Sequence, residues 1–218
     1  STGYQNTATG YNALYYNTTG YYNTASGYEA LRFNTTGVRN TATGYQALYN
    51  NGLGVITNWE AIDNTAIGHQ ALYSNTKGYY NTATGWNALW SNISGNENHA
   101  YGRTALYSNT TGGFNNAFGS QALSNNTSGG YNVALGHNAF YNGTSYSNSI
   151  AIGFASDITA SNQARIGNVS TTSIGGQVGW TTISDARVKN KVQENVPGLT
   201  FIKELRPVTY YYDIDKEN

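Results

Sequence analysis

Hydrophobic and polar positions repeat along this chain with a period of 17 residues. One unit, written from Asn6, reads NTATGYNALYYNTTGYY, and its Ala-x-Gly triplet returns after 17 residues at every step except the third, which is 24. A repeat of this size is typical of stacked coils, in which identical residues form ladders along the axis. The triplets start at Ala8, Ala25, Ala42, Ala66, Ala83, Ala100, Ala117, Ala134 and Ala151.

A second glycine follows the first after ten residues, and an asparagine precedes it by three. Thr, Tyr and Val favour short strands, whereas Gly and Asn tolerate the positive φ of tight corners and disfavour helices. The repeat therefore predicts an all-β fold, a parallel β-solenoid or β-roll of 17-residue coils. Its corners are expected at Asn17, Asn34, Asn51, Asn75, Asn92, Asn109 and Asn126, and at Gly20, Gly37, Gly54, Gly78, Gly95, Gly112 and Gly129.

Two apolar stripes are expected inside the coils. The Ala of each triplet is small enough for a narrow interior, and an Ala-Leu pair, first seen at Ala13-Leu14, recurs in the later units. The residues beside the triplet Ala face outward, because side chains alternate along a strand. They change from Thr7 and Thr9 to Ile150 and Ile152.

An apolar outer face needs a partner, and three copies around an axis satisfy a thin solenoid most simply. The sequence therefore predicts a homotrimer. The side chains expected to be buried towards its axis are Tyr101, Phe118, Leu135 and Ile152.

Aromatic residues form two further columns, one through Tyr11 and one through Tyr15. Stacked rings stabilise neighbouring coils, and flat exposed rings beside Asn and Thr also suit sugar binding. His69 and His137 occupy the Tyr11 position of their units and are expected to be ladder members, so no metal site and no cofactor is predicted. The candidate glycan-binding residues are Tyr11, Tyr28, Tyr45, Trp86 and Trp90.

Seven extra residues interrupt the repeat within residues 51–63. Insertions in solenoids map to one face, often a binding face, although the apolar content here equally suits a bulge that covers a neighbouring subunit. Either interpretation predicts that the insertion leaves the outline of the solenoid while the coils on both sides stay in register.

Composition narrows the functional classes. Charged residues make up 10% of the chain, the formal net charge is zero, and neither Cys nor Met occurs. This chain offers no electrostatic footprint for nucleic acid and no thiol chemistry. Its 14% aromatic content also argues against a disordered tail.

The chain changes character near its C-terminal end. Nine charged side chains lie in residues 1–163, whereas residues 164–218 carry thirteen together with both prolines. We therefore divide the sequence into a repetitive shaft at 1–163, a junction at 164–183 and a second module at 184–218. In that module, Pro197 and Pro207 flank a short helical pattern that precedes an apolar strand.

Two segments resemble known families. The segment NSIAIGFASDITASNQARIGN, residues 148–168, is similar to head repeats of trimeric autotransporter adhesins, which implies a trimeric parallel β-roll. The segment ISDARVKNKVQENVPGLTFIKELRPVTYYYD, residues 183–213, resembles the opening of the α+β intramolecular chaperone domain of phage tail fibres and tailspikes.

The chaperone resemblance implies that the module trimerises first, aligns three shafts and is then released by self-cleavage at the Ser184–Asp185 step. Ser184 would be the nucleophile and Lys189 its base, while the shaft itself would have no enzymatic activity. The expected protein is a structural and receptor-binding trimeric tail fibre, extracellular on a phage or phage-like particle. Its partners would be its own copies, a host-surface glycan or other receptor, and other fibre or tail proteins.

Two alternatives remain open at this point. A bacterial trimeric cell-surface adhesin would share the shaft, and an anchor or secretion signal in the full gene would identify it. An ice-binding solenoid would use Thr-x-Thr ladders to order water, but the Thr stripe ends after Thr84.

Overall fold

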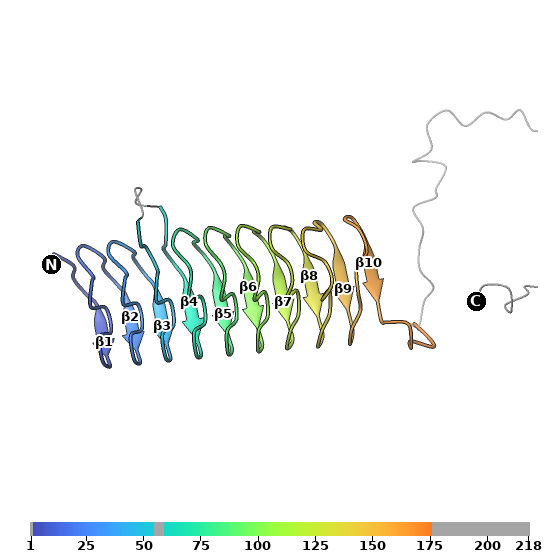
Figure 1. The fold of residues 1–218 in the computed structure, drawn as a ribbon, viewed down its shortest axis with the longest axis horizontal. Helices are drawn as coiled ribbons and strands as arrows, with labels where there is room; N and C mark the ends of the chain where they lie inside the picture. Colours follow the sequence, from blue (N-terminus) through green and yellow to red (C-terminus); the bar gives the residue numbers. More distant parts are fainter. Residues whose placement is uncertain (1, 55–58, 176–218) are drawn as a thin grey trace, which may run out of the picture. The chain divides into compact units, whose positions relative to one another are not determined.

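The computed structural model describes residues 2–54 and 59–175, and this part of the chain is a parallel β-solenoid without helices, as predicted. Ten strands of three residues form one sheet in chain order, each hydrogen-bonded to the next (Figure 1). The strands are β1 (Thr7–Thr9), β2 (Thr24–Ser26), β3 (Thr41–Thr43), β4 (Thr65–Ile67), β5 (Thr82–Thr84), β6 (His99–Tyr101), β7 (Asn116–Phe118), β8 (Val133–Leu135), β9 (Ile150–Ile152) and β10 (Ala164–Ile166).

The register of the sheet places identical residues on top of one another. Ala25 pairs with Ala42, and Ala117 pairs with Ala134, so the central residue of each strand enters one continuous inward column. The triplet alanines from β2 to β9 are fully buried, and the leucines of the Ala-Leu pairs form the second buried column. The sequence prediction of two interior stripes is confirmed.

Asparagine has a role beyond the one predicted. Asn92 is buried, and its Nδ2 donates hydrogen bonds to Asn75 Oδ1 one coil earlier and to the Gly95 carbonyl, both at 2.9 Å. The side chains of these asparagines thus form an internal ladder, while the backbone bends at Ile93 and Ser94, between Asn92 and Gly95. A second buried ladder runs through the asparagine before each strand, Asn23, Asn40, Asn64, Asn81, Asn98, Asn115 and Asn132.

Positive φ angles fall mainly on residues that the sequence analysis did not select. Leu48 in the core has a φ of 51°, and Gln46 before it has the same value. Glycine is required at Gly20 because of a close approach, since an added Cβ would lie 2.5 Å from the carbonyl oxygen of Gly37. The triplet glycine Gly10 has a φ of 131°, a backbone conformation that glycine adopts readily.

The insertion leaves the solenoid between β3 and β4, where Figure 1 shows the chain rising beyond the neighbouring coils. Thr41 of β3 still pairs with Thr65 of β4, so the register expected across the insertion is kept. Asn51 Nδ2 donates to the Ala61 carbonyl at 3.0 Å, the bond that other units make to the second glycine. Ala61 therefore holds the corner that the sequence analysis assigned to Gly54.

The solenoid continues past the shaft boundary expected at residue 163. β10 pairs with β9 after a shorter coil, in which Ala164 lies opposite Ile150. Arg165 lies opposite Ala151, so an arginine occupies the inward column that alanine fills in every earlier strand.

Candidate functional site

One outward column of the sheet is apolar over its C-terminal half. Tyr101, Phe118 and Leu135 are adjacent in the ladder and are 38%, 40% and 49% exposed, respectively, while Ile152 is half-buried. The Tyr101 and Phe118 rings stack with 4.8 Å between their centroids. The residues predicted to be buried in a trimer thus form one continuous stripe on the surface of the single chain.

The first aromatic column is a stack on the coil segment that follows each strand. Tyr11, Tyr28 and Tyr45 have centroids 5.2 Å apart, and His69 continues the stack 4.9 Å from Tyr45, as its place in the repeat predicted. Trp86 follows at 6.4 Å from His69. The negative charge of the Glu29 carboxylate beside the phenol raises the pKa of Tyr28 above its ordinary value, and loss of hydration and the neighbouring Tyr11 and Tyr45 raise it further.

The second aromatic column runs through Tyr49, Tyr73, Trp90 and Tyr107, with centroids 5.0 to 5.6 Å apart. Burial raises the pKa of Tyr73 above its ordinary value, because the phenolate would lose hydration. Trp90 belongs to this column, so the five candidate glycan-binding residues are divided between two neighbouring columns.

Tyr15 does not join this stack directly, because Arg32 fills the intervening coil. The Arg32 guanidinium forms an ion pair with Glu29 and donates a hydrogen bond of 3.2 Å to the Tyr49 hydroxyl. It also lies 5.3 Å from the centroid of the Phe33 ring.

Both columns lose their rings in the same region. The first continues with Arg103 and Ser120 after Trp86, and the second continues with Ser124 after Tyr107 before a ring returns at Tyr141. A groove of about 330 Å³ opens there, which we call the ladder-gap groove. Its lining residues are Trp86, Asn87, Arg103, Thr104, Tyr107, Ser108, Gln121, Ser124, Asn125 and Tyr141.

The ladder-gap groove combines rings with amide and hydroxyl groups. Gln46 Nε2 donates to Glu29 Oε2 and Gln70 Nε2 donates to Gln46 Oε1, both at 2.8 Å, but this polar chain ends before Asn87. Asn87 Oδ1 is buried and has no hydrogen-bond partner among the described residues. Sequence reasoning selected Trp86 but missed the groove, although the missing ring in each column was a readable signal.

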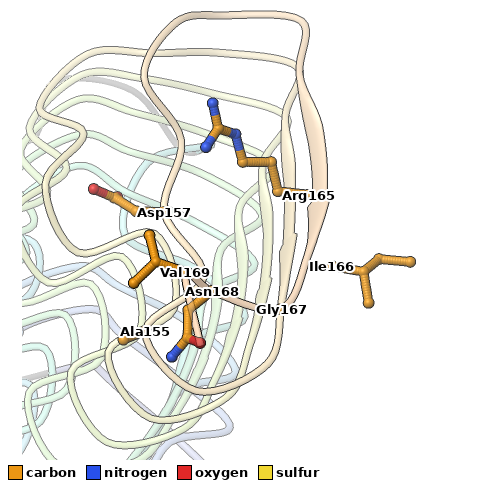
Figure 2. A pocket seen from close by; sticks show the side chains of 7 residues that line it. All are labelled: Ala155, Asp157, Arg165, Ile166, Gly167, Asn168 and Val169. Carbon is orange, nitrogen blue, oxygen red and sulfur yellow. The ribbon is translucent and has the colours of Figure 1, made fainter. Parts of the chain in front are cut away.

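Two other hollows lie on the described part of the chain. Phe114 and Tyr131 stack at 4.8 Å beside a hollow of about 420 Å³ whose lining includes Gly113 and Gly130. A third, of about 530 Å³, lies at the last coil, where Figure 2 shows Arg165 on the inner side of β10 and Ile166 on the outer side.

The predicted catalytic residues Ser184 and Lys189, with the cleavage site Ser184–Asp185, lie outside the described residues. Within residues 2–54 and 59–175, no three His, Asp or Glu side chains come together as metal ligands. In the same ranges no helix is long and apolar enough to cross a bilayer. No family model matches the chain, and neither does any curated protein or solved structure.

Proposed function

We propose that this chain is the shaft of a homotrimeric, receptor-binding tail fibre of a phage or phage-like particle, followed by the start of an intramolecular chaperone. One observation carries the proposal, namely the apolar column Tyr101, Phe118 and Leu135 on the outer face of the sheet. The resemblance of residues 183–213 to a chaperone module supports the same assignment.

A second and third copy of the chain are the partners that suit this column. The column occurs once in each chain and runs along the solenoid axis. A threefold rotation about a parallel axis would therefore bring three identical columns together. Burial of each large apolar side chain would contribute about 1.5–3 kcal/mol. The same column begins with Thr9, Ser26 and Thr43, so the contact would be strongest in the coils of β6 to β9.

A chaperone is physically reasonable for such a shaft. Thr24 pairs with Thr41 and Thr65 pairs with Thr82, so successive N-terminal coils present the same residues. Three identical shafts shifted by one coil would lose few contacts there, as in a register slip between similar strands. A chaperone module that trimerises transiently would fix the register of the three shafts before they associate along their length.

Sedimentation velocity tests the trimer with two matched substitutions in one column. We expect the wild-type chain, expressed with its complete C-terminal module, to sediment as a trimer. Phe118→Asp should shift it towards monomer because it buries a carboxylate at the contact. Thr9→Asp, at the polar end of the same column, should remain trimeric. A monomeric wild type, or equal behaviour of the two variants, would refute the proposed contact.

A further inference from the structure

We propose that the ladder-gap groove binds a saccharide that carries a carboxylate. This inference deepens the receptor-binding role proposed above, since it names the chemical class of the ligand and the coils that hold it. It uses three features of the groove, which are a missing ring, an unpaired buried oxygen and an unpaired guanidinium.

The missing ring creates a slot between two aromatic side chains. Trp90 and Tyr107 stack at 5.5 Å, whereas Ser124 leaves the next coil without a ring before Tyr141. Tyr107 and Tyr141 are two coils apart, which corresponds to about 9.5 Å at the usual strand spacing of ~4.8 Å. That gap suits one pyranose ring, whose polarised C–H groups face the electron-rich faces of aromatic rings.

Polar groups along the groove match the hydroxyls of a saccharide, both beside the slot and two coils before it, where Asn87 lies. Asn87 is 8% exposed, lines the groove, and leaves Oδ1 without a partner among the described residues. Buried acceptors in native proteins are nearly always hydrogen-bonded, and a sugar hydroxyl would supply the missing donor. Gln121 and Asn125 line the same groove and offer both donors and acceptors.

The positive charge of Arg103 favours a saccharide with a negative charge. Arg103 is the charged residue of the lining, and its guanidinium has no ion pair among the described residues. The cationic groups of Arg32, Arg39 and Lys77 are all paired with carboxylates. A free guanidinium beside an uncharged polar groove favours a carboxylate, which it can bind through two parallel hydrogen bonds.

The decisive variant restores the ladder. Ser124→Tyr should place a ring between Tyr107 and Tyr141, so it fills the slot in a way that the column already accepts in other coils. Tyr131→Ser, which removes an exposed ring outside the groove, is the matched control. Thermal unfolding and sedimentation of both variants establish that each remains folded and assembled as the wild type is.

Binding is measured on an array of acidic and neutral glycans, and then by titration with an oligogalacturonate and its carboxyl-reduced derivative as further probes. We expect the wild type and Tyr131→Ser to bind acidic glycans and Ser124→Tyr to bind none. Arg103→Gln should weaken binding of the acidic glycans by about tenfold, the loss of one charge-assisted contact, and leave neutral ones unchanged.

Two outcomes would overturn the inference. The first is a wild type that binds no glycan, and the second is Ser124→Tyr binding as the wild type does. Equal losses for acidic and neutral glycans in Arg103→Gln would refute the role of charge. The trimer is tested separately by sedimentation, so a failure of glycan binding would refute this inference without refuting the trimer.

Discussion

Each buried asparagine before a strand joins three successive coils through its side chain. Asn98 Nδ2 donates to Asn81 Oδ1 at 3.2 Å and to the Gly112 carbonyl at 2.8 Å. Asn98 Oδ1 accepts from the backbone N–H of Asn115 at 3.1 Å. A coil of this size has little apolar interior, so these bonds satisfy the backbone groups that water cannot reach.

Replacement of Asn98 by Ala should therefore destabilise the solenoid strongly. The substitution leaves the buried Asn115 N–H without its acceptor, at about 1–3 kcal/mol. The Gly112 carbonyl loses one of its two donors and keeps the hydrogen bond from Asn109 Nδ2. Asn116→Ala is the control, because Asn116 faces outward from β7 and its side chain has no hydrogen bond among the described residues. Chemical unfolding should give a clearly lower midpoint for Asn98→Ala alone, and equal midpoints would contradict the role of the ladder.

The aromatic columns act at the scale of the repeated element. Tyr73 stacks between Tyr49 at 5.0 Å and Trp90 at 5.6 Å, so its ring bridges neighbouring coils. Because burial raises the pKa of Tyr73 in the folded chain, the folded state holds this proton more tightly than the unfolded state does. Stability is then unaffected below the ordinary pKa of 10.0 and falls as the pH rises above it.

Tyr73→Phe should reduce this loss of stability at alkaline pH. Phenylalanine keeps a ring in the stack but has no proton to lose. Urea midpoints at about pH 8 and about pH 11 should differ less for Tyr73→Phe than for the wild type. Tyr22→Phe, at an exposed tyrosine, should keep the wild-type difference. If both variants show the same pH dependence, burial of Tyr73 is not a source of the alkaline sensitivity.

The repeat predicted the coils correctly. Its Ala and Leu positions recur once in each unit, so stacking of the units is enough to align them in two columns. The burial of Asn92 was not predicted, since Asn is usually exposed and a buried position requires a partner that only the register reveals. The ladder-gap groove was missed for a related reason. The groove forms because Trp86 of the first aromatic column lies beside Tyr107 and Tyr141 of the second. The repeat pattern shows each column but does not show that the two columns line one groove.

At the scale of the whole molecule, assembly and maturation would be linked. A nucleophile and a base five residues apart meet only if the chain turns back or another subunit supplies the partner. If another subunit supplies the partner, self-cleavage at Ser184–Asp185 would depend on correct trimerisation of the chaperone module.

We predict that the full-length protein is cut at Ser184–Asp185 and that Ser184→Ala and Lys189→Ala both abolish the cut. Denaturing electrophoresis with mass spectrometry of the products measures this directly. Lys191→Ala serves as a control, because it removes a lysine of the same segment that lies outside the matched motif. An uncut wild type, or cutting that persists in both variants, would instead indicate a permanently attached trimerisation cap.

Arg165 affects whether the sheet can grow by the addition of another chain at β10. A parallel sheet with an open edge can template another chain and grow into a fibril. Any coil added to β10 in register would have to place its inward side chain over a guanidinium, where each earlier coil meets an alanine methyl. An arginine in the inward column thus opposes the addition of a further coil at this edge, while the pairing of β10 with β9 is kept.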